Sequence, residues 1–356
     1  MASSDEHTVG RARRLGGVRY EIRCPLARLA QGLERTGYEL LKLKTGNPAQ
    51  FGFRAPEAMR LALVENLAQA EGYTHQKGIF PAREAIVVDT QERGIRGVGV
   101  EDVFIGNGVS ELILMAMEAL LDPGDEVLVP SPDYPLWTAA VTLKGGRAVH
   151  YPCRPQNGFV PLAAEIDALV TGATRAIVVI NPNNPTGAVY DRAALEAIVR
   201  VAERRRLVVF SDEIYDRILY DGAAPVPTAT LCNETLCGTF GGLSKVYCAC
   251  GFRTGWIFFS GAARAASDFV DGLELLASLR LCANAPGQWA VQTALGGHQS
   301  ICDLTADGGR LGRQRRALLG GVERSDFLRV VAPQGALYAF PSVDTTKIPH
   351  FDDERF

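Results

Sequence analysis

The sequence predicts an α/β fold in which helices cover both faces of a parallel sheet. Three short runs carry this prediction: Val103–Gly106, Arg175–Ile180 and Leu207–Phe210. They do not alternate apolar with polar residues, which is typical of strands that are buried on both faces. Helical patterns separate them, and strands that alternate with helices indicate a parallel sheet. In such sheets, ligands bind beyond the carboxyl ends of the strands.

Length and charge exclude several classes of function. The 356 residues are 47% hydrophobic and 22% charged, which suffices for one large or two medium domains. The net charge is −3 and the interior has no concentrated basic tract, so nucleic acid is not an expected partner. No apolar run reaches the ~18 residues of a membrane span. No apolar stretch follows the basic cluster Arg11–Arg14, as it would in a secretory signal.

The cysteines and histidines predict no metal centre. The eight cysteines are scattered without a C-x-x-C pair, and the five histidines form no cluster. We therefore expect reduced thiols in a cytoplasmic protein.

The first elements frame two candidate ligand-binding residues. Apolar spacing predicts a helix over Ile22–Leu33, a short strand at Leu40–Leu43 and a further helix over Ala55–Ala70. Gly46 lies in a turn, where its backbone could approach a ligand or simply reverse the chain. Tyr73 lies in a glycine-bounded loop and is either a surface tyrosine or a phosphate ligand.

A strand, a glycine turn and a helix follow. The strand Val103–Gly106 leads through Gly108 and Ser110 into an apolar helix that ends at Leu121. The free N–H groups of such a helix start can bind an anion. The turn lacks the third glycine of a dinucleotide-binding fingerprint. Tyr134, at the start of a later helix, either stacks on a planar ligand or packs in the core.

Polar side chains follow two of the buried strands. Asn184 comes after Arg175–Ile180, and Asp212 comes after Leu207–Phe210. Tyr215 is three positions beyond Asp212 and shares its side if the segment is helical. A buried carboxylate facing a pyridine nitrogen would keep that nitrogen protonated, and an amide with a phenol could hold a ring hydroxyl.

The segment Thr239–Trp256 presents one lysine in a loop of small residues. Lys245 follows Gly241, Gly242 and Ser244, and Arg253 lies eight positions later. An isolated lysine is mostly a solvated surface residue. A desolvated lysine can form a Schiff base with a carbonyl cofactor, and an arginine can bind its phosphate. With Asp212 nearby in the predicted sheet, this pattern indicates pyridoxal 5'-phosphate (PLP).

The last part of the chain predicts a smaller second region. Ala262–Leu281 is amphipathic, and a helix resumes at Gln288–Leu295 after a Pro-Gly break. Leu328–Val331 and Ala336–Phe340 have the composition of two short strands.

The motifs NPNNPTG, SDEIYD and GLSK…GFRTGW resemble class I/II, fold-type I, PLP-dependent aminotransferases, in order and in spacing. GNGVSELI, PDYPLWTAAV and ALGGHQSI are similar to the bacterial members that act on alanine and glutamate. The likeness runs from about Tyr20 to the last residue. It implies a large domain with a mostly parallel seven-stranded sheet and a small α+β domain. The implied division is an N-terminal arm and part of the small domain at 1–54, the PLP domain at 55–320, and the rest of the small domain at 321–356.

The resemblance also implies roles for the site residues. Lys245 would bind PLP covalently and move the proton between the substrate Cα and the cofactor. Asp212 would pair with the pyridinium, Asn184 and Tyr215 with the ring hydroxyl, and Tyr134 would stack on the ring. The residues implied to hold the phosphate are Gly108, Val109, Ser110, Arg253 and, from a neighbouring subunit, Tyr73.

The function predicted in this way is transfer of an amino group from L-alanine or glutamate to a 2-oxo acid. The resemblance implies a homodimer and substrate contacts with Gly46 and Asn184. In the family, the arginine that binds the substrate α-carboxylate follows the segment that ends here at Phe356, so we expect this chain to lack it. Relatives also often carry a basic residue where this chain has Cys248 and an asparagine where it has Gly241. Two alternatives stay open: a PLP-binding relative without turnover, and a PLP-dependent lyase for cysteine-type substrates.

Overall fold

A mixed sheet forms the centre of the molecule. The computed structural model describes residues 9–18, 25–43 and 46–348. In this part of the chain, seven strands pair in the order β1-β7-β6-β5-β4-β2-β3. Only β7 runs antiparallel to its neighbours β1 and β6, so the prediction of a mostly parallel seven-stranded sheet is confirmed. The strands are β1 (Val103–Gly106), β2 (Glu126–Ser131), β3 (Arg147–Pro152), β4 (Thr174–Ile180), β5 (Val208–Asp212), β6 (Leu236–Gly242) and β7 (Gly255–Gly261).

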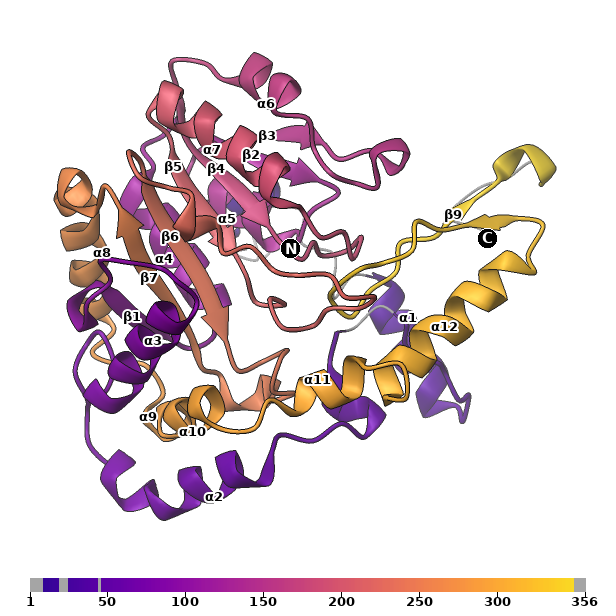
Figure 1. The fold of residues 1–356 in the computed structure, drawn as a ribbon, viewed down its shortest axis with the longest axis horizontal. Coiled ribbons are helices and arrows are strands. Elements are labelled where there is room, and N and C mark those ends of the chain that lie inside the picture. Colours follow the sequence, from indigo (N-terminus) through magenta and orange to yellow (C-terminus); the bar gives the residue numbers. More distant parts are fainter. Residues whose placement is uncertain (1–8, 19–24, 44–45, 349–356) are drawn as a thin grey trace, which may run out of the picture.

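Helices cover both faces of the sheet, as the apolar runs predicted (Figure 1). In β4, Ile177 and Val179 face one core, whereas Val178 and Ile180 face the other. The helices of the first core are α2 (Glu57–Glu65), α3 (Phe80–Glu92), α6 (Ala163–Leu169), α7 (Arg192–Arg205) and α10 (Ala290–Gly296). Those of the second core are α4 (Val109–Leu120), α5 (Leu136–Leu143) and α8 (Ser267–Leu279).

Local sequence explains the clearest of these helices. The side chain of Asp191 accepts a hydrogen bond from the N–H of Ala194 and so caps α7. Leu195, Ile198 and Val199 then lie on one buried face, at the spacing of an amphipathic helix. Among the described helices, none is both long and apolar enough to cross a membrane.

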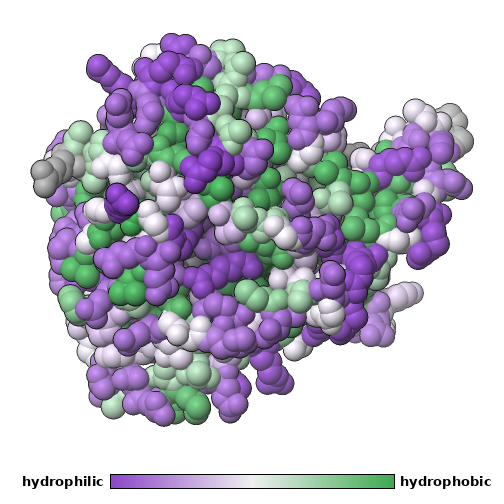
Figure 2. All heavy atoms as spheres, in the orientation of Figure 1, coloured by the Kyte–Doolittle hydropathy of each residue, from purple (hydrophilic) through white to green (hydrophobic). Residues whose placement is uncertain are grey.

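A smaller region lies beside this three-layer body, at the right of Figure 1. It contains α1 (Pro25–Arg35), α11 (Ser300–Thr305), α12 (Arg310–Glu323) and a two-stranded sheet of β8 (Leu328–Arg329) and β9 (Ser342–Val343); the short helix α9 (Ala285–Gln288) precedes α10. Figure 2 shows hydrophobic residues gathered where this region joins the body. The domain boundaries expected at residues 54 and 320 stay a prediction.

Two of the predicted strands are wrong. Leu40–Leu43 forms no strand, and its Leu41 and Leu43 are 77% and 83% exposed, so the run has no buried face to stabilise pairing. Ala336–Phe340 is not the partner of β8 either, because β9 takes that place. Instead, the N–H of Ala336 donates to the carbonyl of Ile218 at 2.9 Å. This contact directs the segment toward the sheet edge where the predicted site residues lie.

Candidate active site

The predicted site residues, apart from Gly108 and Tyr73, line one cavity beyond the carboxyl ends of β4 and β5. The cavity has a volume of about 450 Å³. It is lined by Gly46, Val109, Ser110, Asp133, Tyr134, Pro135, Asn184, Pro185, Asp212, Ile214, Tyr215, Ser244, Lys245, Cys250, Arg253 and Tyr338. We call it the site cavity. Lys245 and Asp212 therefore face the same space, as the sequence predicted.

Asp212 is a buried acid held by neutral donors. It ends β5 and is 3% exposed. The indole N–H of Trp137 donates to Oδ2 at 3.2 Å, and the backbone N–H of Ile214 donates to Oδ1 at 3.4 Å. Burial raises the pKa of the Asp212 carboxyl to about 6, and the neighbouring Glu213 adds to that rise. A cation in the cavity would favour the ionised form.

Lys245 lines the same cavity. It follows β6, and its Nζ donates to the backbone carbonyl of Gly46 at 2.6 Å. Burial lowers the pKa of Lys245, with the positive charge of Arg253 acting in the same direction. A lysine whose neutral form is favoured in this way can act as a nucleophile toward a carbonyl group.

An anion cradle lies where α4 begins. Gly108 has φ +83°, and a Cβ there would lie 2.3 Å from Nη2 of Arg253. The Arg253 guanidinium donates to the carbonyls of Cys250 and Asn107 at 2.8 and 3.0 Å. A Cβ at Gly255 would lie 2.5 Å from the backbone nitrogen of Val109. The two glycines thus let a guanidinium approach the start of a 12-residue helix, an arrangement suited to phosphate.

Two phenols lie together in the lining of the site cavity. The hydroxyl oxygens of Tyr215 and Tyr338 are 2.8 Å apart, and their rings meet edge to face. Burial raises the pKa of both hydroxyls, so both stay protonated at neutral pH. A Cβ at Gly46 would lie 2.0 Å from the Tyr338 oxygen, which leaves room only for glycine. Asn184 lines the same cavity.

Among the residues of the site that escaped the sequence analysis are Tyr338, Asp133 and Trp137. Tyr338 is 123 residues from Tyr215, and no local pattern marks it. Asp133 lines the cavity directly before Tyr134. Trp137 donates a hydrogen bond to Asp212. The sequence could have indicated this contact, because a buried indole requires an acceptor for its N–H. Conversely, Tyr73 is 81% exposed and does not line the cavity of the single chain.

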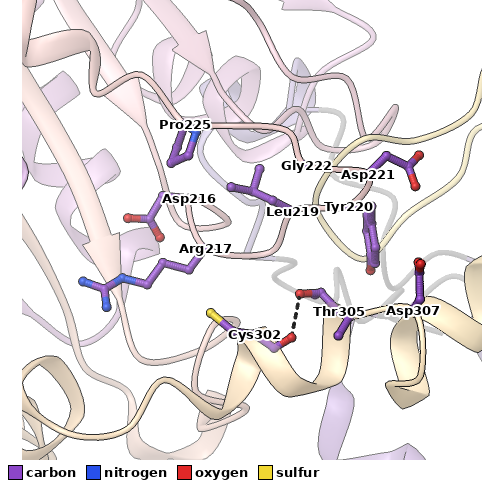
Figure 3. A pocket seen from close by; sticks show the side chains of 11 residues that line it. Asp216, Arg217, Leu219, Tyr220, Asp221, Gly222, Pro225, Cys302, Thr305 and Asp307 are labelled. Carbon is purple, nitrogen blue, oxygen red and sulfur yellow. Dashed lines mark hydrogen bonds between the residues drawn. The ribbon is translucent and has the colours of Figure 1, made fainter.

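A larger cavity, about 610 Å³, lies apart between the segment 216–225 and α11 (Figure 3). Asp216 and Arg217 lie at one end, and Asp221 and Asp307 lie at the other. None of the predicted site residues lines it. The residues that the sequence analysis selected for catalysis and cofactor binding therefore favour the smaller site cavity as the active site.

Comparison with known proteins identifies the family. Residues 38–353 match the model of the family described as aminotransferase class I and II. The chain belongs to the class I and II aminotransferases. It is 51% identical over 342 residues to the glutamate-pyruvate aminotransferase AlaA of Haemophilus influenzae, covering 96% of this chain and 85% of that one. It is 48% identical over 343 residues to an alanine aminotransferase of Mycobacterium tuberculosis, with 96% and 80% covered.

Solved structures agree with this assignment. An aminotransferase from Escherichia coli superimposes with a TM-score of 0.96 at 49% identity, covering 98% of this chain and 86% of that one. An alanine aminotransferase from Pyrococcus furiosus superimposes with a TM-score of 0.90 at 34% identity, covering 94% of this chain and 84% of that one. The fold of this aminotransferase is therefore that of its family.

Class I and II aminotransferases use PLP, and the residues present fit this group. The two glycines of the cradle leave space that a side chain would fill, next to a guanidinium and a helix N-terminus. The hydrogen bonds to Asp212 come from neutral N–H groups, so a cationic ring nitrogen would supply the missing counter-charge. The amine of Lys245 is available on the same cavity.

Proposed function

We propose that this aminotransferase binds PLP in the site cavity and transfers an amino group between alanine or glutamate and a 2-oxo acid. The observation that carries the proposal is a buried acid, Asp212, and a desolvated lysine, Lys245, on one cavity with an anion cradle. The names of the relatives, glutamate-pyruvate and alanine aminotransferase, support the choice of substrates.

Each predicted residue has a task in this proposal. The phosphate would bind Arg253 and the start of α4, which is formed by Gly108, Val109 and Ser110. Asp212 would hold the ring nitrogen, Asn184 and Tyr215 the ring hydroxyl, and Tyr134 would lie against the ring. Bound PLP supplies the electron sink for carbanion chemistry at the substrate Cα. Lys245 Nζ would take a proton from that carbon and return it.

Substrates would enter beside Gly46 and Asn184. The carbonyl of Gly46 accepts the hydrogen bond from Lys245, so this backbone holds the amine in place until the cofactor engages it. Tyr338 lies against Gly46, and both residues line the cavity that the substrate would enter.

A homodimer is part of the proposal. Leu61, Val64 and Leu67 of the α2 segment are each more than half exposed, as are Leu275 and Leu279 of α8. The loop that carries Tyr73 runs between these segments, since the Gln76 amide donates to Glu274 of α8 at 2.9 Å. An exposed apolar surface of this extent is typical of an interface. In a dimer, Tyr73 would reach the phosphate of the partner's site. The cytoplasmic location stays a prediction.

The test begins with absorbance. PLP added to the purified protein should give a visible band of the lysine-bound cofactor, and Lys245→Ala should abolish it. Lys347→Ala, which removes an exposed lysine of the small region, is the control and should keep the band. A wild type without the band, or a band that survives Lys245→Ala, contradicts PLP binding at this lysine.

The reaction is tested with L-alanine and 2-oxoglutarate. Formation of pyruvate, dependent on Lys245, supports the aminotransferase. A bound cofactor without pyruvate would favour the binding-only alternative, and release of a thiol from cystathionine would favour the lyase.

A further inference from the structure

A chain of three polar side chains leads from the site cavity to the surface. Asp133 lines the cavity, Thr138 lies on α5, and His150 lies on β3. Oγ1 of Thr138 is 2.9 Å from Oδ2 of Asp133 and 2.9 Å from Nε2 of His150. Because β3 is an edge strand of the sheet, His150 is exposed. The chain is continuous from the site cavity to solvent.

The single hydroxyl proton of Thr138 links the two ends. When Thr138 donates to an ionised Asp133, its oxygen is free to accept the Nε2–H of His150. When Asp133 is protonated, it can donate to Thr138, which then donates to the lone pair on Nε2. These two arrangements differ by the position of the protons and need no movement of the heavy atoms.

We propose that Asp133, Thr138 and His150 form a proton path between the site cavity and solvent. This proposal rests on the proposed function, because an amino acid arrives as an ammonium ion and must lose a proton before its nitrogen can react. The path gives that proton a route that does not depend on opening the site cavity.

One transfer balances as follows. It begins with an ionised Asp133 and with His150 neutral and carrying its ring proton on Nδ1, so that Nε2 has a lone pair. The ammonium gives its proton to the Asp133 carboxylate. The Asp133 proton then moves to Thr138 Oγ1 while the hydroxyl proton of Thr138 moves to His150 Nε2, and His150 releases its Nδ1 proton to water. One proton leaves the cavity and no electrons are exchanged; exchange of the His150 ring protons with water then restores the Nδ1–H form for the next transfer.

The surroundings favour Asp133 as the group that accepts the proton from the cavity. Burial raises the pKa of Asp133, while the hydrogen bond from Thr138 and the charge of His150 act against that rise. Tyr151 of β3 also faces Asp133, but burial raises its pKa well above the usual value, and its hydroxyl donates to the carbonyl of Val178 at 2.7 Å. Tyr151 therefore stays protonated, and in the part of the chain that the structure describes, His150 is the side chain that links Thr138 to the surface.

The first test is chemical rescue. The PLP-loaded protein is subjected to a pH jump in dilute buffer, and the relaxation of its visible absorbance is followed. We expect His150→Ala to slow the relaxation at least about tenfold, because positioned acid–base groups typically contribute more than that. Added imidazole should restore the rate in His150→Ala but not in Thr138→Val. The control is His298→Ala, which removes an exposed histidine paired with Asp303 at 2.7 Å and should change nothing.

Two outcomes of the rescue experiment overturn the path. One is a His150→Ala variant that relaxes as fast as the wild type. The other is a slowed variant that imidazole does not restore, because a purely structural role of His150 would give that result.

A second test needs no cofactor and is separate from the proposed function. The infrared carbonyl band of Asp133 is recorded in the unloaded protein at an acidic pH at which the carboxyl is protonated, and it is assigned by its loss in Asp133→Asn. Thr138→Val should move this band to higher frequency, because the hydrogen bond to Thr138 is lost. A band that does not move overturns the proposal even if PLP binding is confirmed.

Discussion

The buried carboxyl of Asp212 should make the unloaded protein progressively less stable as the pH rises from acidic to neutral. Burial raises the pKa of Asp212 from 3.8 to about 6. The folded state therefore disfavours the ionised carboxyl, which the unfolded chain carries without that cost. The destabilisation is fully present above about pH 6 and disappears as the pH falls below the unfolded value near 3.8. Asp212→Asn removes this pH dependence and keeps the shape of the side chain.

The expected magnitude follows from the two pKa values. A difference of about two pKa units corresponds to about 3 kcal/mol in the free energy of unfolding. The asparagine keeps one of the two acceptors that serve Trp137 and Ile214, and the lost hydrogen bond costs about 1–3 kcal/mol at every pH. The net stability change at one pH is thus small. The pH dependence of this stability difference is easier to interpret, because the cost of the lost hydrogen bond does not change with pH. About half of the 3 kcal/mol of destabilisation by the ionised carboxyl should disappear between about pH 8 and pH 5.

The assay is urea unfolding of the protein without PLP over that pH range, for the wild type and Asp212→Asn. The stability of the variant relative to the wild type should rise with pH by about 1.5 kcal/mol. Asp191→Asn, which changes an exposed carboxyl at the start of α7, controls for the loss of one charge. A difference that stays constant, or that falls with pH, would refute the argument that burial sets the state of Asp212.

Three further predictions concern the support of the site. Arg93→Met should lower the free energy of unfolding by about 3–5 kcal/mol, because Arg93 pairs with the buried Glu213 at 2.5 Å. The control is Arg192→Met, which removes an exposed arginine, and the urea midpoints of the two variants are compared with that of the wild type. Gly187→Ala should lower the free energy of unfolding by about 1–3 kcal/mol, because φ is +72° and the added Cβ would lie 2.4 Å from the Cβ of Pro333. Gly172→Ala is the control, because a Cβ there has no neighbour within 4 Å. Tyr338→Phe should weaken PLP about fivefold in an absorbance titration, because it removes a hydrogen bond of about 1 kcal/mol to Tyr215. If Tyr338→Phe and the wild type bind PLP with equal affinity, Tyr338 does not support the cofactor site through Tyr215.

Those parts of the site that depend on the sheet could be predicted from the sequence. Asn184 and Asp212 follow strands whose uninterrupted apolar runs are plain, and parallel strands present their carboxyl ends at one edge. Lys245 and Arg253 are separated by a short loop, so their proximity in space could also be predicted from their proximity in the sequence. Ser110 and Tyr134 were candidates from their places at two helix starts, the family resemblance gave them roles, and both line the same cavity.

The rest depends on contacts between distant segments. β3 was not predicted, because it is an edge strand whose Arg147 and His150 face solvent, and it lacks the apolar run of its neighbours. Without β3 the link from Thr138 to His150 could not be seen. The segment Ala336–Phe340 looks like a strand in composition, but its backbone pairs with the chain near Ile218 and Tyr220. Composition does not say which partner a short apolar run will find.

The loop that supplies Asn184 also holds the segment that carries Tyr338. The N–H groups of Gln334 and Gly335 both donate to the carbonyl of Gly187, at 2.8 and 2.9 Å. Gly187 ends the loop that begins after β4, and its missing side chain is what lets Pro333 approach. The amide of Asn184 and the phenol of Tyr338, which both line the site cavity, are thus fixed to one short piece of backbone. A change at Gly187 should therefore disturb both side chains together, whereas a change at Tyr338 alone leaves Asn184 in place.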